Sequence, residues 1–200
     1  MATTTPPRSA TVERSTKETQ INLTLSLDGS GSAELDTGVG FLDHMLELLA
    51  RHGRFDLTVK AAGDLETGAH HTTEDVGIVL GQAIDKALGD RSGITRYGEA
   101  TVPMDEALCA SAIDISGRPY CSFRATLPPT SIAGFDTELA EEFFRAVCNN
   151  ARFTLHVRVL EGSNAHHMIE AAFKSFARAL REAVAVDASE QGVPSTKGVL

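Results

Sequence analysis

Two copies of one short pattern contain four of the seven histidines of this chain. Residues 70–74 read "HHTTE" and residues 166–170 read "HHMIE", so that two adjacent histidines precede a glutamate each time. On a helix, residues three or four positions apart share a face, whereas neighbouring residues point about 100° apart. Either histidine can therefore bind an ion together with the glutamate, but both cannot easily bind the same ion. The pattern predicts metal ligands that can serve two ions: His70, His71, Glu74, His166, His167 and Glu170.

A helix that merely begins in solvent offers another interpretation of each motif. Histidines in a first turn can be hydrated, and a glutamate there offsets the positive end of the helix dipole. That interpretation would suffice for one motif. Chance repetition of the same five-residue pattern at two aligned helix starts is improbable, so the repeat favours metal binding.

Two further histidines can complete the ligand set. His44 lies beside the apolar stripe of a predicted helix, and His156 alternates with Leu155 and Val157 on a predicted strand. Alone, each is typical of a structural histidine. With the motifs they make six imidazoles and two carboxylates, enough for two ions with about four protein ligands each. No cysteine is part of the pattern, so manganese, zinc or iron fits better than copper(I). The sequence does not decide among them.

The elements that carry these residues are themselves duplicated. Apolar residues recur at helical spacing along 70–88 and 166–184, after strands predicted at 54–63 and 152–162 by alternation of apolar and polar residues. Helices are predicted at 40–53 and 140–151, ahead of those strands. Extended segments at 21–35 and 109–123 contain turn signals at Asp28-Gly29 and Ser116-Gly117, which predict hairpins. Residues 10–18 and 96–103 can add a strand to each half.

This order predicts an internally duplicated α+β fold. Each half has about three strands, a helix, a strand and a helix, and a pseudo-twofold relates the halves. Strands grouped with helices on one face indicate a two-layer arrangement. The predicted divisions are a disordered leader at 1–10, a first repeat at 11–92, a second repeat at 93–187 and a C-terminal tail at 188–200.

Composition narrows the class of protein. The net charge of −9 and the pI near 5.2 argue against a nucleic-acid binder. No stretch approaches the roughly 20 apolar residues of a membrane-spanning helix, so no membrane partner is expected. The three cysteines have no metal-type spacing and fit a reducing compartment, which predicts a soluble cytoplasmic protein.

The chain resembles the imidazoleglycerol-phosphate dehydratases of histidine biosynthesis. The resemblance extends from about Arg14 to the C-terminus and includes "RSTKETQI", "GFLDHML", "GDLETGAHHTTEDVGIVLG", "GITRYGEATVPMDEAL", "DISGRPY", "NARFTLHVRVLEGSNAHHMIEAAFKSFARALR" and "GVPSTKG". Gly68-Ala69 stands where that family more often has acidic residues, and no ligand is affected. The resemblance implies a 24-subunit homo-oligomer whose active sites form between subunits. Each active site is implied to hold two manganese(II) ions. The implied metal ligands are His44, His70, His71, Glu74, His156, His166, His167 and Glu170.

The implied reaction converts D-erythro-imidazole glycerol phosphate into imidazole acetol phosphate and water. The reacting carbons have no neighbouring carbonyl, so the imidazole must relay electrons. A divalent cation can stabilise the deprotonated ring. That ring can expel the side-chain hydroxyl through a diazafulvene-like intermediate. By resemblance, Glu18 is the acid–base residue; its alternative role is that of a solvent-facing strand residue.

The phosphate requires cations that this acidic chain must concentrate locally. Arginine can donate to phosphate oxygens in a bidentate fashion, and lysine supplies a point charge. Any one of these cations could instead be an ordinary surface residue, and Arg118 follows a turn glycine where a structural role is credible. We expect the tail to become ordered over bound substrate. The candidates are Arg96, Arg118, Lys174, Ser195, Thr196 and Lys197.

Two other functions remain compatible with the ligand pattern. A metal-binding shell without catalysis would have no need of the phosphate-binding cations. A di-metal phosphohydrolase would use the same ligands to activate water and would release inorganic phosphate. The reaction product distinguishes these functions from a dehydratase.

Overall fold

The computed structural model describes residues 8–200 and divides them into two similar halves. The first half consists of β1 (Ser9–Ser15), β2 (Thr19–Ser26), β3 (Ala33–Asp36), α1 (Gly40–Gly53), β4 (Asp56–Gly63), the short 3-10 helix η1 (Leu65–Thr67) and α2 (His70–Leu88). The second half consists of β5 (Tyr97–Met104), β6 (Ala107–Asp114), β7 (Tyr120–Arg124), β8 (Ser131–Ile132), β9 (Phe135–Asp136), α3 (Leu139–Ala151), β10 (Thr154–Glu161) and α4 (Ala165–Ala183).

Equivalent strands occupy equivalent places in two four-stranded sheets. The strand order is β1-β2-β4-β3 in the first sheet and β5-β6-β10-β7 in the second. In each sheet the third strand in this order pairs antiparallel with one neighbour and parallel with the other. The small β8–β9 hairpin is an insertion in the second half. The predicted duplicated α+β fold is confirmed.

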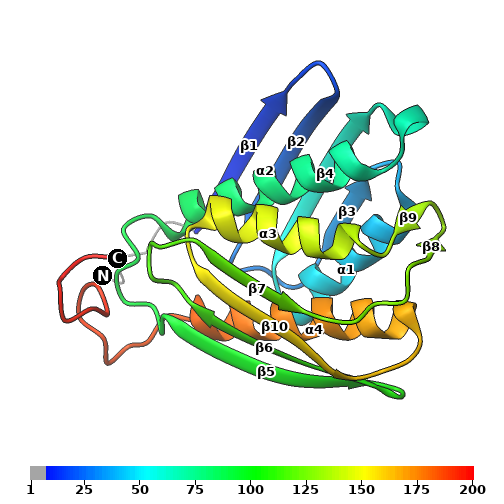
Figure 1. The fold of residues 1–200 in the computed structure, drawn as a ribbon. Helices are drawn as coiled ribbons and strands as arrows, with labels where there is room; N and C mark the ends of the chain where they lie inside the picture. Colours follow the sequence, from blue (N-terminus) through cyan, green and yellow to red (C-terminus); the bar gives the residue numbers. More distant parts are fainter. Residues whose placement is uncertain (1–7) are drawn as a thin grey trace.

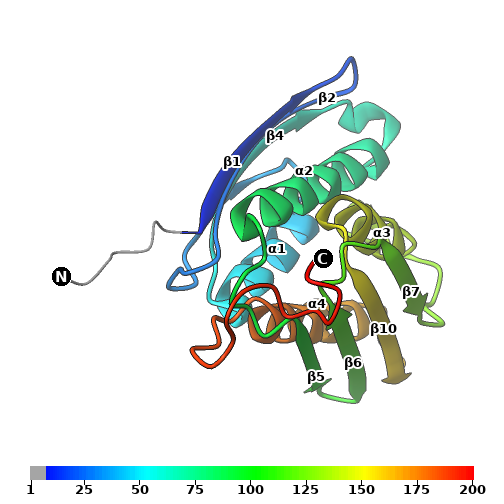
Figure 2. The same cartoon turned by 90° about the vertical axis from the view of Figure 1, so that its left-hand side faces the viewer.

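The two sheets form the outside of the molecule and the helices lie between them (Figures 1 and 2). Each half is a sheet covered on one face by two helices, as predicted. Helix α2 packs on α3, and α1 packs on α4, so the two helix layers share one core. This packing buries the apolar stripes predicted for the histidine helices, namely Val76, Val79, Leu80, Ala83, Ile84 and Ala87 in the first helix and Ile169, Ala172, Phe173, Phe176, Leu180 and Val184 in the second.

The predicted hairpins at Asp28-Gly29 and Ser116-Gly117 are wrong. The chain turns there, but β2 does not pair with β3, and β6 does not pair with β7. Strands β4 and β10 lie between them, because these strands present alternating buried apolar residues to the helix layer. Strand β3 has no fully buried residue and lies at the edge. The hairpins are instead β1–β2 and β5–β6.

Both ends of the described part of the chain make backbone hydrogen bonds to the rest of the fold. Most of the predicted leader, residues 1–7, lies outside the described residues. Strand β1 begins at Ser9, because Ser9 pairs with Ser26 and Ala10 with Leu25, so the last part of that segment belongs to the first sheet. The tail folds back on the second half, where Gly93 donates a hydrogen bond to the Gly192 carbonyl. None of the helices in residues 8–200 has the length and apolar character needed to cross a membrane.

The contact between α2 and α3 depends on a glycine. A Cβ at Gly81 would lie 2.5 Å from the Val147 carbonyl oxygen and 2.7 Å from the Asn150 Cβ. Gly-to-Ala inside a free helix stabilises it by about 1 kcal/mol. We expect Gly81→Ala to do the opposite and destabilise the protein by about 1–3 kcal/mol, because overpacking forces the helices apart.

The thermal midpoint should fall by about 2–4 °C per kcal/mol lost. The matched control is Gly40→Ala, because a Cβ at Gly40 meets no atom within 4 Å. A midpoint for Gly81→Ala at or above that of the unmodified protein would contradict the packing described here.

Candidate metal centre and active site

Both histidine motifs lie at the start of a long helix. Helices α2 and α4 begin at the same end of the molecule and run to the other end (Figure 1). In α4 the first turn is capped by Asn164, whose side-chain oxygen accepts hydrogen bonds from the backbone N–H groups of His166 at 2.9 Å and His167 at 3.4 Å. The cap fixes where the helix begins and therefore where its histidines project.

Three candidate ligands converge at the start of α4. The Nε2 atom of His166 lies 3.1 Å from Oε2 of Glu170, and Nε2 of His44 lies 3.7 Å from the same oxygen. One ligand atom from each of these residues can be chosen so that all three lie within 4.8 Å of one another. The side chain of Glu170 is nearly buried, whereas both histidines are about 40% exposed. The predicted four-residue spacing thus places His166 and Glu170 on one face.

The electrostatics of this group keep Glu170 ionised. Burial opposes the charged carboxylate, but a hydrogen bond from Lys174, the charge of Lys174 and that of His44 outweigh burial, so the pKa of Glu170 lies below its usual value. The Lys174 Nζ is 2.6 Å from Oε1 of Glu170. An ionised carboxylate beside two imidazoles is a ligand set that suits a divalent cation.

The second histidine of each motif turns away from the first and contacts a carboxylate. The rings of His166 and His167 are nearly perpendicular, at an interplanar angle of 83°. Nδ1 of His167 donates to Glu106 at 2.7 Å, and Nδ1 of His71 donates to Asp64 at 3.0 Å. These hydrogen bonds raise the pKa of each histidine above its usual value. The hydrogen bond from His167, with those from two backbone N–H groups, lowers the pKa of Glu106 to about 2.

The remaining candidate ligands stay apart from this cluster within one chain. His70 and Glu74 are exposed at the start of α2, and their side chains make no hydrogen bond or ion pair in residues 8–200. His156 is half-buried on β10, in a shallow hollow that Ala112 and Arg158 also line, and its ring centroid is 5.7 Å from that of Tyr120. The group His44, His166 and Glu170 is the set that one chain assembles in its described part.

Glu18 lies in the turn of the β1–β2 hairpin, close to the first motif. Asp75 on α2 is buried and accepts hydrogen bonds from Arg14 at 3.1 Å and from Thr19 at 2.5 Å. These contacts fix both strands of the hairpin to the helix that carries His71. The exposed Glu18 carboxylate is one of the charges that raise the pKa of His71. A free carboxylate is thus held beside the candidate metal ligands.

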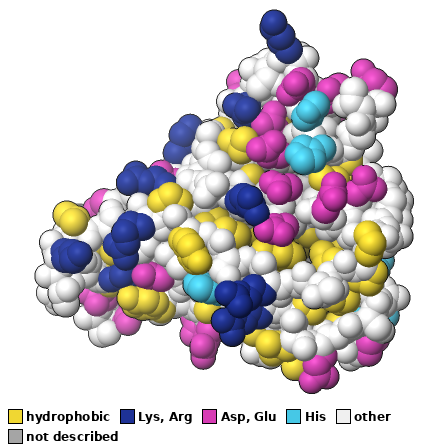
Figure 3. All heavy atoms as spheres, in the orientation of Figure 1, with side chains coloured by type: hydrophobic (Ala, Val, Ile, Leu, Met, Phe, Trp, Pro, Cys, Tyr) yellow, Lys and Arg dark blue, Asp and Glu magenta, His cyan; other side chains and the backbone are white. Residues whose placement is uncertain are grey.

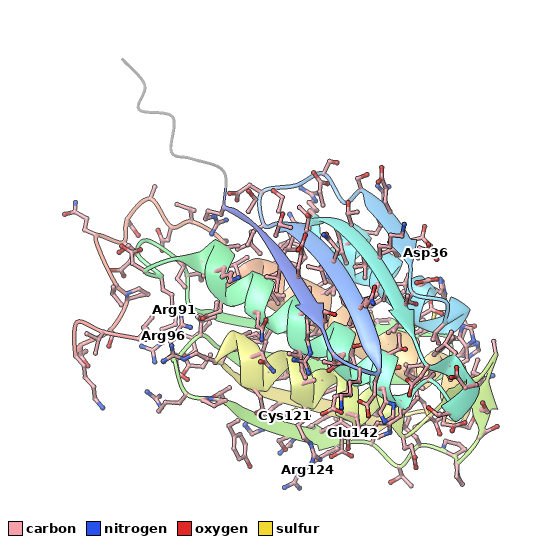
Figure 4. All side chains as sticks on the ribbon, turned by 90° about the horizontal axis from the view of Figure 1, so that it is seen from above. Asp36, Arg91, Arg96, Cys121, Arg124 and Glu142 are labelled. Atoms are coloured by element: carbon pink, nitrogen blue, oxygen red, sulfur yellow. The ribbon has the colours of Figure 1, made fainter. Side chains whose placement is uncertain are left out.

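The candidate phosphate ligands fall into two groups. Lys174 lies one turn after Glu170, whereas Arg96 donates to Asp114 at 2.7 Å and to the carbonyl of Pro194 in the tail at 2.8 Å. Figure 4 shows Arg96 beside the tail. Arg118 is exposed in the β6–β7 loop, and its guanidinium donates to the Ser116 carbonyl. Ser195, Thr196 and Lys197 are in the tail itself, where the Ser195 hydroxyl accepts from the Lys197 N–H.

The cluster of His44, His166 and Glu170 lies at the start of α4 and the tail follows its end, with Lys174 at the middle of the helix. At 1.5 Å per residue, the helix separates His166 from Ala183 by about 25 Å. On the face in Figure 3, many basic side chains cover the half of the molecule that holds the tail, while histidines lie among acidic side chains at the other end. One small phosphorylated substrate cannot bridge this distance within one chain.

Sequence reasoning missed Asp64, Glu106 and Asp75. Asp75 follows Glu74 directly and looks like an ordinary helix residue, so only the packing of the hairpin reveals its contacts. Glu106 could have been found by comparing the halves, because Glu18 directly precedes β2 and Glu106 directly precedes β6. That comparison requires the β1–β2 and β5–β6 hairpins, which the sequence did not reveal.

The fold and the site define a class of protein: a duplicated α+β chain in which histidines and carboxylates project from matching helix starts. A model of the family described as imidazoleglycerol-phosphate dehydratase matches residues 37–180. The chain belongs to this family.

Similar proteins and similar solved structures support the same family assignment. It is 58% identical over 193 residues to the imidazoleglycerol-phosphate dehydratase of Geobacter sulfurreducens, covering 96% of this chain and 99% of the relative. It is 60% identical over 189 residues to that of Symbiobacterium thermophilum, covering 94% and 91%. Its fold matches the crystal structure of the Staphylococcus aureus dehydratase with a TM-score of 0.81 and 46% identity, covering 89% and 99%. The Pyrococcus furiosus dehydratase, solved with (S)-C348, has a TM-score of 0.81 and 38% identity, covering 94% and 100%. The chain is therefore an enzyme, a hydro-lyase that acts on a phosphorylated imidazole.

Proposed function

We propose that this enzyme dehydrates D-erythro-imidazole glycerol phosphate to imidazole acetol phosphate, as a cytoplasmic step of histidine biosynthesis that depends on two manganese(II) ions per active site. The observation that supports it best is the convergence of His44, His166 and Glu170 at the start of α4, in a chain of this family. The reaction removes a hydroxyl from the carbon attached to the ring and then a proton from the next carbon, a net loss of water, and the resulting enol tautomerises to the ketone.

The residues present fit a divalent cation. Ligand atoms about 2.0–2.2 Å from one ion lie at most roughly 4.4 Å apart. The separations of 3.1 Å and 3.7 Å from Glu170 to the two histidines are within this limit, and all three ligand atoms lie within 4.8 Å of one another, so a small side-chain movement suffices. Imidazole and carboxylate ligands without thiolate are compatible with manganese, and we propose it on family grounds. When bound, such an ion stabilises the deprotonated substrate ring.

We further propose that the active sites form between subunits of a 24-subunit homo-oligomer. Within one chain, His70, Glu74 and His156 make no common cluster with His44 in residues 8–200. A second ion with about four ligands then requires these side chains from a neighbouring copy. The same assembly would bring the tail of one copy to the histidine end of another, and so unite the two groups of phosphate ligands.

Each group of side chains then has a separate task. Glu18 would protonate the departing hydroxyl as a carboxylic acid and then, as the carboxylate, take the proton from the next carbon, because its side chain is exposed and has no hydrogen-bond partner in the described part of the chain. Lys174 supplies charge beside the ions. Arg96 and Arg118, with the tail residues Ser195, Thr196 and Lys197, bind the phosphate and exclude water as the tail closes.

A metal-stripping experiment tests this function. We expect a chelator to abolish turnover and to shrink the assembly in light scattering, because ligand energy between subunits is also assembly energy. Added Mn²⁺ should restore both, and the product should be a ketone formed without inorganic phosphate. Phosphate release alone would indicate a phosphohydrolase. Full metal loading with no product would indicate a metal-binding shell, and unchanged size after complete stripping would contradict shared sites.

A further inference from the structure

A carboxylate holds the second histidine of each motif, and it does so in the same way in both halves. Both oxygens of Asp64 lie near Nδ1 of His71, at 3.1 Å and 3.0 Å, and Oε2 of Glu106 lies 2.7 Å from Nδ1 of His167. An ionised carboxylate can only accept a hydrogen bond. The proton of each neutral ring is therefore on Nδ1, which leaves the lone pair on Nε2; Oδ2 of Asp105 lies 3.8 Å from Nε2 of His167, too far for a hydrogen bond.

This arrangement is what a metal-binding histidine requires. Such a histidine commonly donates its other ring N–H to a carboxylate, which fixes the ring and makes the ligand nitrogen more basic. On the proposed function above, we infer that Asp64 and Glu106 are positioning residues that direct Nε2 of His71 and His167 toward the ions.

The two carboxylates come from different elements. Asp64 lies in the loop between β4 and α2, whereas Glu106 lies in the turn of the β5–β6 hairpin. The pseudo-twofold equivalent of Glu106 is Glu18, because each directly precedes the second strand of its half. The second half thus uses its hairpin carboxylate to hold a histidine. The first half uses Asp64 for that task, and Glu18 remains available for proton transfer.

Each positioning residue also links the hairpin to the loop ahead of the helix. The backbone N–H of Asp64 donates to the Glu18 carbonyl at 3.1 Å. Glu106 accepts from the backbone N–H groups of Asn164 at 2.8 Å and Ser163 at 3.2 Å. A purely structural role in the loop is therefore the competing explanation, and the experiment must separate it from a role through the histidine.

A double-mutant cycle on Mn²⁺ affinity makes this separation. The metal-free protein of each variant is titrated with Mn²⁺ alone, free ion is measured by electron paramagnetic resonance, and light scattering records assembly along the titration. We expect Glu106→Ala to weaken Mn²⁺ binding by about 10–100-fold. In the His167→Ala background the same change should alter affinity by no more than about twofold, since the histidine through which it acts is gone. The corresponding cycle of Asp64→Ala with His71→Ala should give the same pattern: a loss of Mn²⁺ affinity when His71 is present and almost none when it is absent.

Two variants complete the design. Glu161→Gln removes an exposed carboxylate that makes no side-chain hydrogen bond or ion pair in residues 8–200, and it should leave Mn²⁺ affinity unchanged. Glu106→Gln keeps an oxygen for the two backbone N–H groups and replaces Glu106→Ala if that variant does not assemble. It should show a smaller loss that also disappears in the His167→Ala background.

The outcomes distinguish this inference from the function on which it rests. If Glu106→Ala costs as much with His167 absent as with it present, Glu106 acts through the loop and the inference is wrong. The inference is also wrong if His167→Ala weakens binding while Glu106→Ala and Glu106→Gln do not. If His167→Ala leaves Mn²⁺ binding intact, the proposed metal site itself fails.

Discussion

Glu18→Gln should lower kcat by about 10²–10⁴-fold, the usual contribution of a positioned acid–base group. The side chain keeps its size and loses its ability to take and return a proton. Since Glu18 makes no hydrogen bond or ion pair with a candidate ligand in the described residues and acts on His71 only through its charge, Mn²⁺ affinity should change no more than a few-fold and assembly should be kept. Steady-state assays on imidazole glycerol phosphate, with metal titration of the same samples, measure both.

The hairpin that carries Glu18 is held rigidly, so a change in kcat can be attributed to the side chain itself. Its hairpin is fixed to α2 through the contacts of buried Asp75 with Arg14 and Thr19, so the substitution should not move the backbone. Glu66→Gln is the matched control, because Glu66 is an exposed carboxylate of η1 in the same region and should tolerate the change. A kcat for Glu18→Gln within a few-fold of the unmodified enzyme would remove Glu18 from the mechanism.

Glu170→Gln should lower activity by roughly 10³-fold or more and weaken Mn²⁺ binding with it. A metal ion contributes several kcal/mol of charge stabilisation, and each 1.36 kcal/mol is about tenfold in rate. The substitution removes the negative charge that His44, His166 and Lys174 share. It also removes the carboxylate that pairs with Lys174. The uncompensated positive charge of Lys174 then repels the cation, in addition to the loss of a negatively charged ligand.

The response of activity to excess Mn²⁺ distinguishes the effect of Glu170→Gln from that of Glu18→Gln. Excess Mn²⁺ should partly restore Glu170→Gln and should not restore Glu18→Gln. Glu47→Gln is the control, because Glu47 is an exposed residue of α1, the helix that carries His44, and its side chain makes no hydrogen bond or ion pair in the described range. Full activity of Glu170→Gln at the metal concentration that saturates the unmodified enzyme would show that Glu170 is not a ligand.

The duplicated fold could be predicted because its signals are local. Helical spacing of apolar residues and the alternation of apolar and polar residues on the strands are visible within short windows, and all twelve stripe residues predicted for the histidine helices are buried. Strand pairing is not local. The turns at Asp28-Gly29 and Ser116-Gly117 exist, but where the strands go depends on which of them can cover the helix layer.

In the candidate site too, contacts within one helix could be predicted from the sequence, and contacts between distant segments could not. The four-residue spacing of His166 and Glu170 could be predicted, since helix geometry alone brings them together. The contact of His44 with Glu170 joins residues more than a hundred positions apart, and only the packing of α1 on α4 explains it. Asp64 and Glu106 were missed because a hydrogen bond between a loop or hairpin carboxylate and a histidine has no periodic signature.

Diffraction from crystals of the assembled protein grown with Mn²⁺, recorded on both sides of the manganese absorption edge, tests the central claim most directly. We predict two anomalous peaks per chain, one of them against Nε2 of His44, Nε2 of His166 and the Glu170 carboxylate, with ligands from more than one subunit overall. Histidine motifs that face away from any ion in crystals of active enzyme would contradict the proposal.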